Sequence, residues 1–489
     1  MNLNLKLIFR ALGALMMVMG GALILPLMVS LLYSEIETAI AFIITIVPTL
    51  LIGFFVYFGI SPTKTRLTVR DGFLIVSVSW ILAAIVGSIP FIISGTIPNP
   101  IEAFFETSSG LTTTGATILG DVESLPKGIL FWRSFTHWIG GMGILVFAVA
   151  ILPSLGIGAN LIAASEAPGP TLDKITPKIS DTAKRLYQIY GILTTLEIIC
   201  LMLAGMSLFD ALIHTFGSVG TGGFSNYNNS IAHFNSALIE MIITIFMVLS
   251  AVNFNLYFYS LRNKGGVFNL FKDSEFKFYL CIVGIPTLLI AMNLFFSGIY
   301  KGFMESLRFS SFQVATILTT TGYMSSNYDV WPTFSKMILL TLFCIGGCSS
   351  STGGGIKVIR ILVMLKLIGR GIAVRLHPNA IISVKINDKK LSIDTVSAIA
   401  NFIFLYIVTV IVSTGLICLE GVDVISSLSA VLACIGNVGP GFNLVGPVNN
   451  FGFFSDPVKL LLTLLMLAGR LEVFTFLMLF SRRFWLYDK

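Results

Sequence analysis

Hydrophobic residues occur in long runs along the whole chain, and polar residues gather in the short stretches between them. Runs of about 20 apolar residues have the length that a helix needs to cross the hydrocarbon core of a bilayer. The first run is longer than the apolar core of a signal peptide, so we interpret it as a retained span. The pattern predicts ten spans, at residues 9–33, 39–60, 72–95, 130–155, 185–207, 236–261, 277–299, 334–375 (interrupted), 394–418 and 458–481.

Four of the stretches between spans contain a glycine loop that follows a short apolar segment. They read TTTGAT (112–117), GTGGFS (220–225), TTTGYM (319–324) and NVGPGF (437–442). The unit of span, half-helix, glycine loop and span therefore occurs four times, and such internal repetition usually reflects the architecture. Non-helical backbone at membrane depth is tolerated only where it is buried in protein or lines a water-filled cavity. We therefore expect four loops around one pore.

These repeats define the expected fold class and domains. The fold class is an all-α polytopic membrane protein, with four repeats in a pseudo-fourfold arrangement and two extra spans at the N-terminus. The expected bounds are 1–71 for the N-terminal extension, then 72–160, 161–265, 266–378 (with a broken second span) and 379–489 for the pore repeats.

The equivalent glycines can be aligned between repeats. Matching Glu102-Ala103 to Asp210-Ala211, the shared starts of two half-helices, places Gly115 on Gly223 without a gap. Gly220 is the alternative, but His214 stands six residues before it. The residues six positions before the preferred glycines are all small, which allows close helix packing. They are Ser109, Gly217, Thr316 and Ala433, before Gly115, Gly223, Gly322 and Gly439.

Glycine suits a loop that must turn successive carbonyls toward one axis, because it accepts backbone angles that other residues resist. In a potassium-channel filter, carbonyls of a TVGYG-like loop replace the hydration shell of the ion, and the first and third loops resemble that sequence. Four ordinary glycine turns are the alternative. The expected ion-binding residues are Thr113, Thr114, Gly115, Thr221, Gly222, Gly223, Thr320, Thr321, Gly322, Asn437, Val438 and Gly439.

Composition and charge support a membrane protein with a defined orientation. The chain is 55% hydrophobic and 11% charged, whereas soluble domains carry about 25% charged residues. With the N-terminus inside, 24 of the 31 Lys and Arg residues fall on the cytoplasmic side. This bias follows the positive-inside rule and predicts that both termini are cytoplasmic. The net charge of +7 is therefore assigned to cytoplasmic loops rather than to nucleic-acid binding.

The second span of the third repeat is interrupted by GGCSSSTGGGIK (346–357). Five glycines and four Ser or Thr residues cannot hold a membrane helix by propensity alone. We interpret this loop as a flexible gate across the pore, with a passive hinge as the alternative. A phosphate-binding P-loop is disfavoured, because Lys357 is not followed by Ser or Thr. The expected gate residues are Gly346, Gly347, Ser349, Ser350, Ser351, Thr352, Gly353, Gly354, Gly355 and Arg470.

Arg470 falls inside the last predicted span, where an ionisable residue indicates a function by default. Glu472 is two residues away and does not share its helix face, so carbonyls or hydroxyls of residues 346–355 are the expected partners. Structural anchoring is the alternative role. Arg133 and His137 are interpreted as packing or interface residues. The six cysteines have no metal-site spacing, and no catalytic motif appears, so an enzyme is not expected.

Several longer motifs resemble one family of cation transporters. They are ETSSGLTTTGAT (106–117), RSFTHWIGGMGILV (133–146), FDALIHTFGSVGTGGFS (209–225), TTTGYMSSNYDVWP (319–332), GGCSSSTGGGIK (346–357), IGNVGPGFN (435–443) and LAGRLEVFTFLMLF (467–480). On these motifs the chain resembles the Trk/Ktr/HKT superfamily, and within it the TrkH-type potassium-uptake subunits. The resemblance covers nearly the whole chain.

The resemblance implies a potassium-uptake pore in the bacterial inner membrane, with K⁺ bound at the filter residues and no covalently bound cofactor. It also implies a homodimer, surrounded by membrane lipid, and a cytosolic TrkA-like ring of RCK domains that binds ATP, ADP or NAD(H) and gates the pore. In the superfamily a serine at one central glycine position accompanies sodium preference. All four positions here are glycine, so potassium is favoured. A sodium or less selective carrier of the alternating-access type is the alternative.

Overall fold

The computed structural model describes residues 3–61, 68–143, 179–262, 266–380, 382–387, 389–479 and 481–485. This described part is mostly helical, and its only strands are β1 (Lys385–Ile386) and β2 (Lys389–Lys390), which form a short antiparallel hairpin. The expected all-α class is confirmed.

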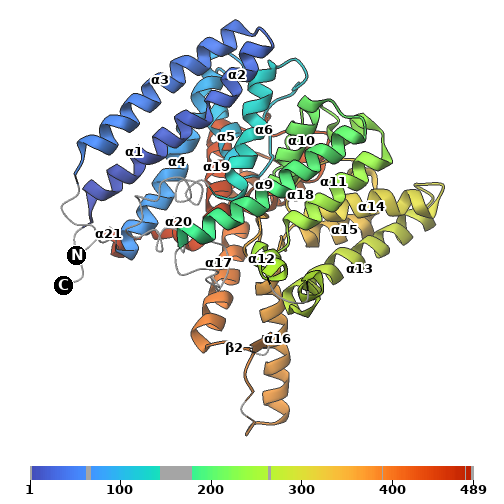
Figure 1. Cartoon of the computed structure of the whole chain (residues 1–489). Coiled ribbons are helices and arrows are strands. Elements are labelled where there is room, and N and C mark those ends of the chain that lie inside the picture. The colour runs from blue at the N-terminus through green and yellow to red at the C-terminus, as the bar shows by residue number, and fades with distance from the viewer. Residues whose placement is uncertain are drawn as a thin grey trace.

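The N-terminal extension consists of α1 (Leu5–Ala22), α2 (Ile24–Leu32) and α3 (Ile36–Gly59). α1 and α3 pack closely because glycines face each other across the pair: a Cβ on Gly53 would stand 2.9 Å from the carbonyl oxygen of Gly13. Small residues allow this close approach between membrane helices. The extension lies beside the first repeat (Figure 1), where α1 and α3 contact α4.

The four expected repeats follow in order, each with a long helix, a short helix and a returning segment. The first has α4 (Val69–Ile93), α5 (Pro100–Leu111) and α6 (Lys127–Gly141), and the second has α9 (Ile179–Leu203), α10 (Leu208–Gly220), α11 (Ala237–Ser250) and α12 (Phe254–Arg262). The third has α13 (Ser274–Phe296), α14 (Phe303–Leu318), α15 (Thr333–Leu342) and α16 (Val358–Leu376). The fourth has α17 (Ile393–Cys418), α18 (Val424–Ile435), α19 (Asp456–Arg470) and α20 (Val473–Met478), followed by α21 (Arg482–Trp485).

Contacts between repeats run in a closed circle. α6 of the first repeat packs on α10 of the second, α11 of the second on α14 of the third, and α19 of the fourth on α5 of the first. The third and fourth repeats meet where Phe343 packs against Phe442, with ring centroids 5.7 Å apart. The short helices α5, α10, α14 and α18 are thereby gathered inside the bundle. In Figure 1, α16 and the β1–β2 hairpin project away from it.

Among the described residues, six helices are long and apolar enough to span a membrane, or seven if one bent pair counts as a span. The returning segments of the last three repeats are broken, although only the break in the third was expected. α11 and α12 meet at a bend of 88°, and the fourth repeat breaks between α19 and α20, where Glu472 has a φ of +57°. The predicted continuous spans 236–261 and 458–481 are therefore wrong in this respect.

A physical reason for the break between α11 and α12 lies in the third repeat. The backbone N–H of Phe254 donates to the carbonyl oxygen of Ser350 at 3.1 Å, and the carbonyl oxygen of Ala251 accepts from Cys348 at 2.9 Å. Backbone groups freed at membrane depth need such partners. The end of the predicted span 130–155 and the predicted boundary between residues 160 and 161 lie outside the described residues.

Candidate functional site

Each short helix ends directly before its glycine loop. Three of the four starts have a side-chain cap, from Asn99, Ser207 and Asp423, which fixes where the helix begins. The C-terminal ends carry a partial negative charge from the helix dipole. All four of these ends approach the same place, because the loops that follow them are in mutual contact. Such an arrangement favours a cation.

The four loops share one backbone conformation. Two residues before each central glycine stands a residue in the left-handed region, with φ of 55°, 57°, 60° and 55° at Thr113, Thr221, Thr320 and Asn437. The glycines Gly115, Gly223, Gly322 and Gly439 have φ of 79°, 77°, 84° and 102°. Gly220 instead ends helix α10 and has no positive φ. The backbone therefore makes Gly223, as preferred from the sequence, the equivalent of the other three.

A repeated hydrogen bond ties each loop to its helix. The N–H of the residue before each glycine donates to the carbonyl five residues earlier. These acceptors are the small residues that stand six positions before the glycines. The bonds are Thr114 to Ser109 at 2.8 Å, Gly222 to Gly217 at 2.7 Å, Thr321 to Thr316 at 2.8 Å and Val438 to Ala433 at 2.8 Å.

The glycines and the carbonyls before them alternate around a closed ring. A Cβ added to any of the four glycines would collide with the carbonyl oxygen that precedes the glycine of the next repeat. The fourth case closes the circle, since a Cβ on Gly439 would stand 2.7 Å from the oxygen of Thr114. The pairs, with the glycine first, are Gly115 and Gly222, Gly223 and Thr321, Gly322 and Val438, and Gly439 and Thr114.

The structure thus brings together all twelve residues that the sequence analysis assigned to ion binding. The side chains of the non-glycine members of this set are all buried. A cavity of about 140 Å³ opens on one side of the ring and is lined by Gly115, Gly223 and Gly322 and by residues that follow them. Negative charge lies beside this cavity. Asn228 donates to Asp121 at 2.9 Å, and this hydrogen bond lowers the pKa of the Asp121 carboxyl. The ionised carboxylate attracts cations toward the cavity.

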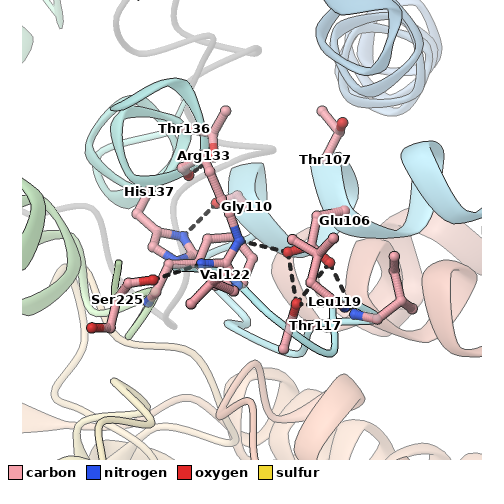
Figure 2. Close-up of polar contacts among 12 residues, drawn as sticks. Glu106, Thr107, Gly110, Thr117, Leu119, Val122, Arg133, Thr136, His137 and Ser225 are labelled. Atoms are coloured by element: carbon pink, nitrogen blue, oxygen red, sulfur yellow. Dashed lines mark hydrogen bonds and ion pairs between the residues drawn. The ribbon is translucent and has the colours of Figure 1, made fainter. Parts of the chain in front are cut away.

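Arg133 and His137 hold the first and second loops, a role that the sequence analysis did not identify. Figure 2 shows Arg133 between Glu106, at 2.6 Å, and the carbonyl oxygen of Ser225, at 3.0 Å. The Glu106 carboxylate also accepts from the hydroxyl of Thr117 at 2.9 Å and so holds the chain after the first glycine. Both members of the Arg133–Glu106 pair are buried.

His137 bridges the same two repeats. Its Nδ1 lies 2.7 Å from the carbonyl oxygen of Gly110, at the end of α5 (Figure 2). Its Nε2 accepts from the N–H of Phe224, directly after Gly223, at 3.2 Å. The helical spacing of Arg133 and His137 was visible in the sequence. Their partners were not, because Glu106, Gly110 and Phe224 come near them only through the packing of repeats.

The predicted gate segment lies against the third and fourth loops of the ring. The N–H of Gly354 donates to the hydroxyl of Thr320 at 2.7 Å, and a Cβ on Gly354 would stand 2.5 Å from the carbonyl oxygen of Gly436. The segment is fastened at its far side, where Glu275 accepts from the N–H and hydroxyl of Ser349 at 2.6 and 2.7 Å. Residues 346–355 therefore cross directly beside the third and fourth loops.

Arg470 lies at the end of α19 and reaches this segment. Its Nη1 donates to the carbonyl oxygen of Thr352 at 2.8 Å, as the sequence analysis expected. Its Nη2 donates to the carbonyl oxygens of Gly140 and Gly141 at 2.6 and 2.7 Å, at the end of α6. Glu472 pairs with Arg360 at 2.6 Å.

Comparisons with known proteins match the chain to one family. A sequence model of the TrkH family, described as a cation transport protein, matches residues 38–487. The chain is 40% identical over 486 residues to the Trk system potassium uptake protein TrkH of Salmonella typhimurium, covering 99% of this chain and 100% of that protein. It is 36% identical to the Trk system potassium uptake protein TrkG of Escherichia coli, covering 99% of both.

A solved structure is similar over the same length. The crystal structure of the potassium transporter TrkH from Vibrio parahaemolyticus superimposes with a TM-score of 0.88 at 37% sequence identity. The match covers 99% of this chain and 100% of that chain.

Proposed function

We propose that this chain, which belongs to the TrkH family of cation transport proteins, is the membrane subunit of a potassium-uptake system. The names of its relatives support the transported ion. The observation that carries the proposal is the closed ring in which the four glycines alternate with four backbone carbonyls. A ring of carbonyls is the chemistry that replaces the hydration shell of K⁺.

In this proposal the ring is the selectivity filter and the cavity beside Gly115, Gly223 and Gly322 is its outer mouth. The C-terminal ends of α5, α10, α14 and α18 add negative potential at the ion. Arg133, which lines the cavity, has its charge matched by Glu106, so the positive charge does not oppose K⁺ at the mouth.

The segment 346–355 is the gate. In this proposal the segment closes the path at the inner end of the ring, and its contacts with Thr320 and Gly436 support that placement. Arg470 stabilises this closed position, because one guanidinium joins Thr352 of the segment to the end of α6. An arginine offers five donors in a fixed fork, so it can hold several carbonyls at once.

The resemblance to the family also supports a proposal for the assembly. We propose a homodimer in the bacterial inner membrane with both termini in the cytoplasm, as the distribution of Lys and Arg predicts. A separate cytosolic subunit with nucleotide-binding RCK domains opens the gate. The relatives are named as parts of a Trk system, which supports a second component. The repeat bounds 1–71, 72–160, 161–265, 266–378 and 379–489 are part of the same proposal.

Liposome recordings test the function. Purified protein is reconstituted in vesicles with opposed K⁺ and Na⁺ gradients, and the reversal potential is measured. A potential close to that of K⁺ supports a potassium-selective pore. A reversal potential that does not depend on the K⁺ gradient would refute the proposal. A K⁺ current that requires Na⁺ on the same side of the membrane would favour a coupled carrier instead.

A further inference from the structure

A carboxyl group is buried in the second repeat, and no cationic side chain pairs with it in the part of the chain that the structure describes. Glu197 lies on α9 and its side chain is fully buried. Its Oε1 lies 2.5 Å from the hydroxyl of Ser218, while its Oε2 has no hydrogen-bond partner among the described residues. The four ion pairs found in the described part of the chain involve Glu102, Glu106, Glu240 and Glu472, not Glu197.

The partner of Glu197 lies close to the second glycine loop. Ser218 follows Gly217, whose carbonyl oxygen accepts the hydrogen bond that ties Gly222 to its helix. The carbonyl oxygen of Ser218 itself accepts from the N–H of Thr221 at 3.2 Å. Glu197 therefore contacts the last turn of α10 at the point where the loop begins.

A second contact extends this network to the third loop. The carbonyl oxygen of His214 accepts from the hydroxyls of both Ser218 and Tyr323, each at 2.9 Å. Tyr323 follows Gly322 directly, and its hydroxyl also donates to the carbonyl oxygen of Phe224 at 3.3 Å. One buried network thus joins α9, the second loop and the third loop.

We propose that Glu197 is a positioning residue for the ring: its hydrogen bond to Ser218 holds the end of α10, and with it the spacing between the second and third loops. This deepens the proposed function, since it assumes that the ring selects the ion. A buried polar group inside a membrane is costly and persists mainly where it has a role. Here the hydrogen bond, rather than a negative charge, is the acting feature, because no cation balances the group among the described residues.

The test compares five variants by reversal potential in K⁺ and Na⁺ gradients, and one of them, Gly223→Ser, reports on the filter itself. Glu197→Ala and Ser218→Ala each remove the contact, and the permeability ratio of K⁺ to Na⁺ should fall about five-fold, the scale of one lost hydrogen bond. Glu197→Gln keeps a hydrogen-bonding group of the same shape and should stay near the wild-type ratio. Thr195→Val is the matched control, because Thr195 is on the same helix but exposed, with its hydroxyl bonded to Gly191.

Three outcomes overturn the inference. If Glu197→Ala and Ser218→Ala reduce only the yield or thermal stability and leave the ratio unchanged, the carboxyl is structural. If Glu197→Gln falls as far as Glu197→Ala, the charge matters and not the hydrogen bond. If Gly223→Ser also leaves the ratio unchanged, the proposed filter fails and the inference falls with it. If Gly223→Ser lowers the ratio while Glu197→Ala and Ser218→Ala do not, the filter stands and only the role of Glu197 is refuted. Ser218→Ala is a small change, so it keeps the test decisive if Glu197→Ala does not fold.

Discussion

Asn437 donates a hydrogen bond of 2.9 Å from Nδ2 to the hydroxyl oxygen of Thr114, which joins the fourth glycine loop to the first. The other three loops have threonine where the fourth has Asn437. All four residues adopt a left-handed backbone, a conformation that asparagine tolerates better than most residues. The hydrogen bond joins the last repeat to the first, whose loops are 323 residues apart in the chain. It therefore closes the ring of loops non-covalently.

The first prediction concerns this closing bond. Thr114→Val keeps the side-chain shape but removes the acceptor for Asn437, as well as the 2.8 Å contact with Thr112. Thr321→Val is the matched control, because Thr321 makes the equivalent 2.8 Å contact with Thr319 in the third loop. Thr114→Val should destabilise the protein by about 1 kcal/mol more than the control, since one further hydrogen bond is lost. Unfolding in detergent measures both, and equal destabilisation would contradict the role of the bond.

The second prediction concerns the glycines. Replacing Gly115, Gly223, Gly322 or Gly439 with Ser should lower the K⁺ to Na⁺ permeability ratio about ten-fold or more, because the new Cβ displaces a carbonyl of the ring; ten-fold corresponds to about 1.4 kcal/mol. Reversal potentials measure the ratio. Unchanged potentials in all four variants would refute the filter.

Gly298→Ser is the control for backbone strain in that experiment. Gly298 also has a positive φ, of 70°, but a Cβ there would meet open space, so the ratio should not change. Gly220→Ser should change the ratio less than Gly223→Ser. It is expected to reduce the yield, because its Cβ would stand 2.7 Å from the carbonyl oxygen of His137.

The third prediction concerns the buried pair of Arg133 and Glu106. Arg133→Ala should destabilise the protein by about 3–5 kcal/mol, because it leaves an unmatched buried carboxylate. The double variant Arg133→Gln with Glu106→Gln removes both charges. It should lower the free energy of unfolding less than either single variant, Arg133→Gln or Glu106→Gln, because each of those leaves one buried charge unmatched. Size-exclusion profiles and unfolding in detergent give the comparison. Additive effects in the double variant would show that the two groups do not act as a pair.

The sequence predicted the repeats and the glycine register because both depend on local patterns. Apolar runs marked the helices. Aligning Glu102-Ala103 with Asp210-Ala211, at the starts of two short helices, placed Gly115 on Gly223 without a gap. The breaks at Val252 and at Glu472 could not be predicted in this way. Neither position carries glycine or proline, and the backbone groups freed near Ala251 are bonded by residues of the third repeat. The partners of Arg133, His137 and Glu197 likewise depend on contacts between separate helices.

The fourth prediction concerns the cytosolic partner. The chain matches a Trk system potassium uptake protein over 99% of its length, and the proposal assigns nucleotide binding to another subunit. Calorimetry with the purified chain alone should therefore detect no saturable binding of ATP, ADP or NAD(H). The same titration with the reconstituted system serves as the positive control. Tight ATP binding by the isolated chain would contradict this division of roles.

The last prediction concerns the contact of Arg470 with the proposed gate segment, residues 346–355. Because its guanidinium holds Thr352 together with Gly140 and Gly141, Arg470→Ala should free the segment and raise ion flux without the cytosolic partner. Arg470→Lys keeps the positive charge but replaces the planar guanidinium with a compact ammonium, which cannot reach Thr352 and α6 together as well. Its ion flux should therefore lie between those of the wild type and Arg470→Ala. A deletion within residues 349–354 should also raise the flux. The K⁺ to Na⁺ ratio should hardly change, because the ring itself is intact.

Liposome flux recordings measure these variants after expression and monodispersity have been checked, since loss of three hydrogen bonds at the end of α19 can also unfold the bundle. Arg360→Ala is the matched control: it breaks the neighbouring pair with Glu472 but leaves the contacts of Arg470 with Thr352 intact, so the gate should stay closed. Folded Arg470 variants with unchanged or reduced flux would exclude the gate role. Arg470 would then be an anchor that fixes α19 to α6, and the position of the segment against Thr320 would need another cause.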